Sequence, residues 1–244
     1  MNISIVIPSY DGWDRLPALF AEIIRSLSLY TRPVDFEIII VDDGSLNRSV
    51  DPVTELRNKG VNVKGVFLKR NYGQQLATLA GLRVSRGDYI ITMDDDLSHN
   101  PEDFSKLLSM AEKDTFDAVF GIPENSRTGL LRKGGSGLRD IIFSIFFRMP
   151  KGLSVSSFRI LSRSLVDRII CDISEYRYLS VEILKHTRSI ANIQVKYNRE
   201  GGKTSRYDFV KLVKLAFSLI RCSGVFPGSI RRSGIASGME WDLI

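Results

Sequence analysis

The first half of the chain alternates short apolar runs with longer amphipathic stretches. The apolar runs are rich in Val and Ile, which predicts strands at Ile3–Pro8, Phe36–Val41, Val61–Leu68, Tyr89–Met93 and Ala118–Gly121. Helical spacing between them predicts helices at Leu16–Leu29, Val53–Asn58, Gln74–Val84 and Pro101–Ala111, the last capped by Asn100. Strands that are apolar throughout are typical of a mostly parallel sheet with helices on both faces. The predicted fold class is therefore α/β, with a Rossmann-like central sheet.

Polar clusters follow three of these strands. They are Ser9-Tyr10-Asp11, Asp42-Asp43-Gly44-Ser45 and Asp94-Asp95-Asp96. In open α/β sheets, ligands collect beyond the carboxyl ends of the strands. We therefore expect the functional residues at this edge.

The three consecutive carboxylates, Asp94 to Asp96, directly follow an apolar strand. Adjacent carboxylates repel one another, and burying an unpaired one is costly, so a counter-charge is expected. In an extended segment Asp94 and Asp96 point the same way and can share one ion. All-oxygen ligands suit a hard cation, Mg²⁺ or Mn²⁺, which normally also holds substrate phosphates. The alternative is a solvated acidic turn.

A second acidic pair, Asp42 and Asp43, ends another strand. A carboxylate in this place can accept hydrogen bonds from a base or a ribose. Alone, the pair is more typical of a turn with an Asp helix cap. The presence of two acidic clusters at one edge favours a ligand site, in which one cluster binds the nucleoside and the other holds a metal on the pyrophosphate.

The second half is more basic. Residues 125–151 carry six basic side chains and one acidic one, with an apolar run at Ile141–Phe147. A helix is expected at Glu175–His186, followed by a strand in which Ile193, Val195 and Tyr197 alternate. Lys196–Arg232 contains nine basic and two acidic residues, with apolar residues at helical spacing and Lys211, Lys214 and Arg221 elsewhere on the wheel. Basic residues beside apolar segments are typical of helices that lie on an anionic membrane surface. The alternative is that the apolar residues pack in the core and the basic residues lie on solvated helix faces.

The composition restricts the compartment and the partners. The net charge of +6 indicates an anionic partner. Nucleic acid is disfavoured because stacking aromatics are not interleaved with the basic residues and the sheet edge is acidic. We find no signal peptide or transmembrane helix, and Cys171 and Cys222 fit two buried thiols in a reducing compartment. A cytoplasmic protein is expected, peripheral at the cytoplasmic face of the membrane.

Several motifs occur in a recognisable order. They are Ile5–Tyr10 (IVIPSY), Ile40–Ser45 (IVDDGS), Arg70–Ala77 (RNYGQQLA), Asp94–Leu97 (DDDL), Ser157–Ile160 (SFRI) followed by Arg163, and Arg199–Tyr207 (REGGKTSRY). Together they resemble the family 2 inverting glycosyltransferases of the GT-A fold. Within that family they are similar to the polyprenyl-phosphate glycosyltransferases, the group of dolichol-phosphate mannose synthase and undecaprenyl-phosphate sugar transferases. The resemblance covers roughly residues 3 to 222.

The resemblance implies roles for individual residues. It assigns the nucleotide pocket to Pro8, Tyr10, Asp42 and Asp43. It assigns the metal, and through it the diphosphate of the nucleotide sugar, to Asp94 and Asp96, with Asp95 in the variable middle place. It implies that Arg199, Lys203 and Ser205 bind phosphate on the acceptor side. Asp96 and Arg199 are the catalytic candidates, because a fixed cation and a guanidinium stabilise the charge that develops on the leaving diphosphate.

The sequence departs from the family pattern in places. Asp11-Gly12 replaces the Asn-Glu found in many relatives, and Ser98 replaces a usual Gln. An acid often found just before the Phe-Arg pair is missing, and Ser154, Ser156 and Ser157 stand there instead. A hydroxyl acceptor needs a base, whereas a phosphate acceptor is already anionic. The missing acid therefore favours a phosphate acceptor or indicates impaired catalysis. For the two histidines, His99 and His186, structural roles are expected.

We therefore predict a GT-A domain at residues 1–206 and a basic amphipathic helical extension at residues 207–244 that lies on the membrane surface. The activity expected is inverting, metal-dependent transfer from a UDP- or GDP-sugar to polyprenyl phosphate. One alternative acceptor is the hydroxyl of a saccharide or lipid-linked glycan. This alternative would be favoured if Asp140 or Asp167 reached the acceptor side of the pocket and served as the base. Another alternative is a catalytically silent nucleotide- or membrane-binding protein. Relatives often continue into transmembrane helices, so a separate membrane-anchor protein is a further possible partner.

Overall fold

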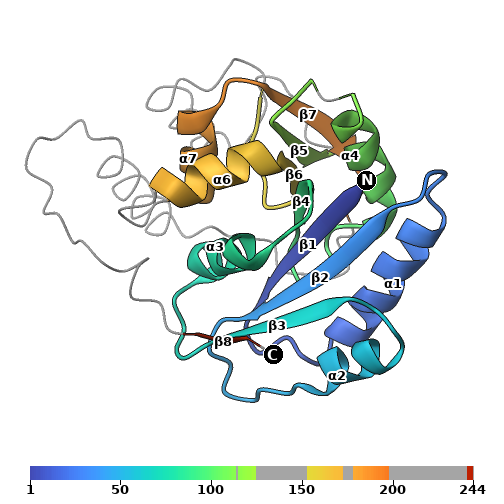
Figure 1. Ribbon diagram of the computed structural model, residues 1–244, viewed down its shortest axis with the longest axis vertical. Helices are drawn as coiled ribbons and strands as arrows, with labels where there is room; N and C mark the ends of the chain where they lie inside the picture. The colour runs from blue at the N-terminus through green and yellow to red at the C-terminus, as the bar shows by residue number, and fades with distance from the viewer. Residues whose placement is uncertain (114, 125–152, 173–177, 198–240, 244) are drawn as a thin grey trace, which may run out of the picture.

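The computed structural model describes residues 1–113, 115–124, 153–172, 178–197 and 241–243. Its sheet has eight strands in the order β7-β5-β6-β4-β1-β2-β3-β8 (Figure 1). The strands are β1 (Asn2–Ser9), β2 (Asp35–Asp42), β3 (Val63–Leu68), β4 (Tyr89–Thr92), β5 (Ala118–Pro123), β6 (Arg159–Ser162), β7 (Ile190–Val195) and β8 (Trp241–Leu243). The helices are α1 (Leu16–Ser28), α2 (Asp51–Asn58), α3 (Gln74–Val84), the 3₁₀ turn η1 (Pro101–Asp103), α4 (Phe104–Ala111), α6 (Arg163–Asp172) and α7 (Leu179–His186).

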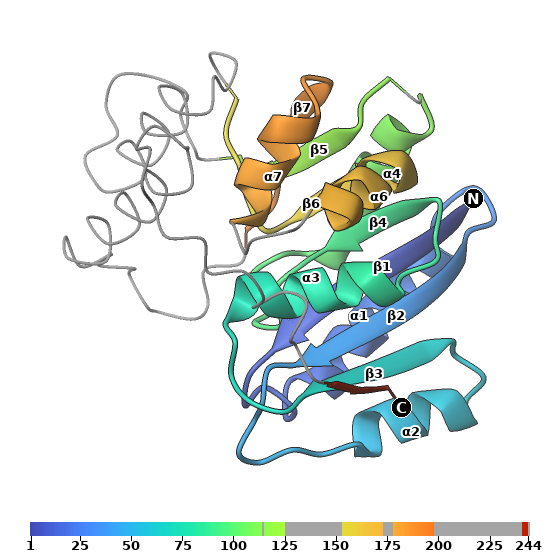
Figure 2. The same cartoon turned by 60° about the vertical axis from the view of Figure 1, so that its left-hand side comes forward.

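Helices cover both faces of the sheet, because successive strand residues point to opposite sides. Ile5 and Ile7 of β1 pack in one apolar cluster with residues of α1, α2 and α4. Val6, between them, packs in the other cluster with residues of α3, α6 and α7. Figure 2 shows the resulting three layers, with α3, α6 and α7 on the opposite side of the sheet from α1, α2 and α4.

The parallel centre of the sheet confirms the predicted fold class. Strands β3, β2, β1 and β4 run parallel to one another, and β5 is parallel to β7. The apolar runs therefore became the buried central strands. The five predicted strands and four predicted helices of the first half are present, with ends shifted by a few residues. The last of these helices begins as the turn η1, where the Asn100 side chain accepts the N–H of Glu102 at 3.0 Å as the expected cap.

Three described elements were not predicted. Strand β6 pairs antiparallel with both β4 and β5, and α6 follows it directly. Strand β6 has only four residues, too few to show a period. Strand β8 pairs antiparallel with β3, which places residues 241–243 on the main sheet. Residues 207–240 of the predicted extension and the apolar run Ile141–Phe147 lie outside the described residues.

Candidate active site

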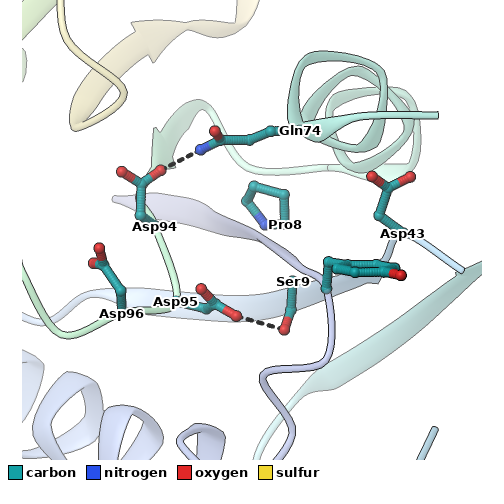
Figure 3. A pocket seen from close by; sticks show the side chains of 8 residues that line it. Pro8, Ser9, Asp43, Gln74, Asp94, Asp95 and Asp96 are labelled. Carbon is teal, nitrogen blue, oxygen red and sulfur yellow. Dashed lines mark hydrogen bonds between the residues drawn. The ribbon is translucent and has the colours of Figure 1, made fainter. Parts of the chain in front are cut away.

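A pocket of about 270 Å³ lies at the carboxyl ends of β1, β2 and β4, beside the start of α3 (Figure 3). The parallel register brings these strand ends together, since Ser9 pairs with Asp42 and Val6 with Thr92. The lining residues are Pro8, Ser9, Tyr10, Asp43, Gln74, Asp94, Asp95 and Asp96. The polar clusters expected at this edge therefore do meet in one place.

Asp43 is the acid that connects β2 to helix α3. Its side chain is buried, and its two oxygens accept the backbone N–H groups of Tyr72 at 2.7 Å and Gly73 at 2.8 Å. Burial raises the pKa of Asp43, an effect opposed by these two hydrogen bonds and reinforced by the charge of Asp42. The carboxylate thus fixes the start of α3 and still lines the pocket.

Asp42 lies elsewhere than the sequence suggested. It is fully buried and is not among the residues that line the pocket. Its carboxylate accepts hydrogen bonds from Trp13 Nε1 at 3.2 Å, from Arg48 Nε at 2.8 Å and from the Ser45 hydroxyl. The structure therefore places Asp42 as a support for the loop after β2, and only Asp43 of the acidic pair reaches the pocket.

The acidic triplet follows β4 in a bent loop, because the strand ends at Thr92 and Leu97 has a positive φ of 58°. The alternation expected for an extended segment is therefore wrong for Asp94 to Asp96. All three line the pocket, and each is held differently. Tertiary contacts, not strand periodicity, orient these carboxylates.

Asp94 is held by three neighbours. Gln74 Nε2 donates to Asp94 Oδ1 at 2.5 Å and Ser157 Oγ donates to Oδ2 at 2.7 Å. His99 Nδ1 lies 3.9 Å from Asp94 Oδ2, and the imidazole stacks on Phe158 with the ring centroids 5.0 Å apart. Burial lowers the pKa of His99 although Asp94 and Asp96 oppose that shift, so the ring is neutral near pH 7.

Asp95 and Asp96 turn to different partners. Asp95 Oδ2 accepts from Ser9 Oγ at 2.6 Å and lies 3.1 Å from Arg15 Nη2, and Figure 3 shows Asp95 turned toward Ser9. Asp96 Oδ1 accepts the N–H of Ser98 at 3.0 Å. The other oxygen of Asp96 makes no hydrogen bond within the described part of the chain, so it is available to a ligand.

The donor set fits a cation that is shared with a substrate. In the described residues, no group of three or more His, Cys, Asp or Glu side chains is arranged to hold a metal ion. Two carboxylates, Asp94 and Asp96, nevertheless line a pocket that contains four acids. Mg²⁺ is usually bound through one or two carboxylates together with substrate phosphates and water. The pocket therefore suits a cation whose remaining ligands come from a diphosphate.

A second cavity of about 270 Å³ lies on the other side of Asp94. Its walls come from β5, the segment before β6 and the end of β7: Gly121, Ile122, Pro123, Ser154, Val155, Ser156, Ser157, Val195 and Tyr197, together with Asp94 and His99. Behind it, Arg159 is buried and bonded to Thr92 Oγ1 at 3.1 Å and Ser180 Oγ at 3.0 Å. Burial lowers the pKa of Arg159 to about 10, so the guanidinium stays charged near pH 7.

Comparison with known proteins identifies the chain. The family model described as "Glycosyl transferase family 2" matches residues 4–187. The chain belongs to glycosyl transferase family 2. The family expected from the motifs is confirmed, and with it the assignment of the chain as a nucleotide-sugar glycosyltransferase.

Two curated relatives of this family 2 chain carry the same name, undecaprenyl-phosphate 4-deoxy-4-formamido-L-arabinose transferase. The protein from Serratia proteamaculans is 32% identical over 231 residues, which cover 93% of this chain and 69% of the relative. The protein from Pectobacterium carotovorum subsp. carotovorum is 31% identical over 231 residues, covering 93% of this chain and 68% of the relative.

Solved structures show the same GT-A fold for this family 2 chain. Glucosyl-3-phosphoglycerate synthase from Mycobacterium tuberculosis, in complex with Mn²⁺, UDP and phosphoglyceric acid, matches with a TM-score of 0.64 at 18% identity and covers 99% of this chain and 86% of that chain. TarS 1-349 from S. aureus matches with a TM-score of 0.55 at 19% identity, covering 88% of this chain and 64% of that chain.

Some residues expected in a family 2 site lie outside the pocket or outside the described residues. Asp167 lies on α6, is exposed, and pairs with Arg163 at 3.4 Å. Asp140, Arg199, Lys203 and Ser205 lie outside the described residues. Cys171 is exposed, where the sequence predicted a buried thiol. In the described ranges we find no helix with the length and apolar character needed to cross a bilayer.

Sequence reasoning gave no binding role to three residues that line the pocket, Ser9, Gln74 and Asp95. Ser9 and Gln74 lie within the motifs IVIPSY and RNYGQQLA, so the motifs contained a signal for them. The role of Asp95 depends on Arg15, which belongs to no motif.

Proposed function

We propose that this family 2 glycosyltransferase moves a sugar from a nucleotide-diphosphate sugar to the phosphate of a polyprenyl carrier, with inversion at the anomeric carbon. The observation that carries the proposal is that Asp43, Asp94 and Asp96 line the same pocket at the carboxyl edge of the sheet. The names of relatives that match 93% of the chain support the choice of an undecaprenyl-phosphate acceptor.

The proposed donor site uses both acidic clusters. Pro8, Tyr10 and Asp43 would line the nucleoside, with Asp42 supporting the loop from behind. Asp94 and Asp96 would hold Mg²⁺ or Mn²⁺, and the crystal structure of the glucosyl-3-phosphoglycerate synthase with Mn²⁺ and UDP supports a divalent cation. A cation bound there supplies positive charge to the diphosphate as the sugar–phosphate bond breaks. Gln74 and Ser157 each donate a hydrogen bond to one oxygen of Asp94 and so fix the orientation of this carboxylate.

The second cavity is the proposed acceptor side. In an inverting transfer, an acceptor oxygen attacks the anomeric carbon while the bond from that carbon to the diphosphate oxygen breaks on the opposite face. A hydroxyl acceptor would require a base, and the described lining offers only Asp94, assigned to the cation, and His99, whose lowered pKa makes it a weak base. A phosphate acceptor requires none. Arg199, Lys203 and Ser205 are proposed to bind its charge.

The proposed place of action is the membrane surface on the cytoplasmic side. Polyprenyl carriers are lipids, and the basic segment Lys196–Arg232 supplies the charge that anionic headgroups attract. The triple variant Lys211→Gln, Lys214→Gln, Arg221→Gln should release the protein from anionic vesicles. A matched triple variant of exposed residues, Lys59→Gln, Arg86→Gln, Lys113→Gln, should not. Equal binding by both variants would refute the membrane-surface role of the segment.

The deciding experiment offers a panel of UDP- and GDP-sugars to the purified protein with two acceptors, undecaprenyl phosphate and a set of saccharides. Transfer to undecaprenyl phosphate in the presence of Mg²⁺ or Mn²⁺ is expected, and Asp96→Asn should abolish it while the exposed-site control Asp14→Asn does not. Transfer only to saccharide hydroxyls would overturn the acceptor assignment. Binding of nucleotide without transfer to either acceptor would indicate a catalytically silent protein.

A further inference from the structure

The middle acid of the triplet, Asp95, sits in a small network of its own. A single oxygen, Oδ2, accepts the Ser9 hydroxyl at 2.6 Å and the Arg15 guanidinium at 3.1 Å. The Asp95 side chain lines the pocket and is 15% exposed, whereas Arg15 is 40% exposed and is not among the lining residues. Within the described residues, Arg15 is the Lys or Arg side chain that forms an ion pair with the acidic triplet.

Gly12 makes this network possible. A Cβ on residue 12 would lie 2.0 Å from Asp95 Oδ2, 2.6 Å from Arg15 Nη2 and 2.7 Å from Ser9 Oγ. The Arg15 N–H also donates to the carbonyl of Gly12 at 3.0 Å, which closes the turn that brings the guanidinium back toward the pocket. Any side chain at residue 12 would therefore displace one of the three groups. We call Ser9, Gly12 and Arg15 the Asp95 clamp.

The Asp95 clamp affects which carboxylates of the triplet can bind a metal ion. Three adjacent flexible carboxylates would compete for one cation and would repel a diphosphate. Asp95 is paired with Arg15 and turned toward Ser9, whereas Asp94 and Asp96 form no ion pair with a Lys or Arg in the described part of the chain, so their charge is left for a cation. We propose that Arg15 is a positioning residue that acts through Asp95, holding this carboxylate out of the metal site and cancelling its charge. This inference rests on the proposed function for its cation and diphosphate.

A double-mutant cycle on Arg15 and Asp95 tests the clamp. Arg15→Gln should weaken binding of UDP in the presence of Mn²⁺, measured by calorimetry, by about tenfold, equivalent to roughly 1.4 kcal/mol. Mn²⁺ alone, followed by electron paramagnetic resonance, should bind at least as tightly, since a third carboxylate has been released. Asp95→Asn leaves the Arg15 charge uncancelled beside the diphosphate and should bind UDP more tightly than wild type, and the double variant should recover to within about threefold of wild type. Arg32→Gln is the matched charge control, because Arg32 is 68% exposed and pairs with Glu112.

Two outcomes would overturn the proposal. If the double variant binds UDP as weakly as Arg15→Gln, Arg15 acts directly on the ligand or on the fold. If Gly12→Ala, which keeps the Arg15 charge but leaves no room for the clamp, binds UDP and Mn²⁺ like wild type, the geometry has no role in the site.

The clamp and the proposed function can fail separately. Thermal unfolding without ligand should show coupling, with Arg15→Gln lowering the melting temperature and Asp95→Asn restoring it in the double variant. A wild-type protein that binds neither Mn²⁺ nor UDP would refute the proposed function, while the unfolding cycle would still judge the clamp. Additive unfolding effects would refute the clamp whatever the ligand data show.

Discussion

Asp43→Asn is the substitution for which the structure gives the clearest energetic expectation. Asp43 is 3% exposed, and its two oxygens accept two backbone N–H groups at the start of α3. Asparagine has almost the same shape but only one acceptor oxygen, so its NH₂ group would face one of the two N–H donors. A buried donor left without a partner costs about 1–3 kcal/mol. Relief of the buried charge, and of repulsion from Asp42, offsets part of this cost.

We therefore expect Asp43→Asn to lower the free energy of unfolding by about 1–2 kcal/mol. For a chain of this size, each kcal/mol corresponds to a change of about 2–4 °C in melting temperature. The measurement is urea unfolding at pH 7, with Asp14→Asn as the control because Asp14 is exposed. A loss indistinguishable from that of Asp14→Asn would show that the two hydrogen bonds do not hold the start of α3.

The pH dependence gives a second test of the same residue. The pKa of Asp43 is raised above its ordinary value of 3.8, so the folded state binds this proton more readily than the unfolded state. Its contribution to stability is therefore greatest below pH 3.8 and declines as the pH rises through the folded pKa. Asp43→Asn should remove this decline. An unchanged slope above pH 3.8 would contradict the raised pKa.

Three further predictions follow from individual contacts. Asp96→Ala should abolish Mn²⁺-dependent binding of UDP, measured by calorimetry; retained binding would exclude Asp96 as a ligand. Ser157→Ala removes the hydroxyl that holds Asp94 and should raise KM for the donor about fivefold, a cost of about 1 kcal/mol, in steady-state assays; an unchanged KM would show that Gln74 alone suffices. For Glu37, burial raises the pKa, but Lys64, the Ser4 hydroxyl and the Arg86 N–H outweigh it and lower the pKa below 4.5, so the stability it provides is present above pH 4.5 and lost on acidification. Glu37→Gln should lower stability at pH 7 by about 1–3 kcal/mol and flatten the acid limb of the unfolding profile, and an unaltered acid limb would count against the assignment.

Much of the fold could be predicted because its signals are local. Apolar runs such as the one in β1 and amphipathic stretches such as α1 contain their own periodicity, and a strand buried on both faces reads as apolar throughout. The parallel direction of the central strands then brings their carboxyl ends to one edge. This is why the positions of Asp43, Asp94 and Asp96 near one another could be predicted without coordinates.

The sequence determined which chemical groups gather at this edge, and the motifs determined the family. Only the tertiary structure decided how each acid is used. Asp42 and Asp43 are neighbours in the chain, yet one is buried beneath a loop and the other faces the pocket. Asp95 meets Arg15 across 80 residues and Asp94 meets Ser157 across 63. Contacts of this kind depend on strand order and on the room left at Gly12, and neither is encoded in any local period of the sequence.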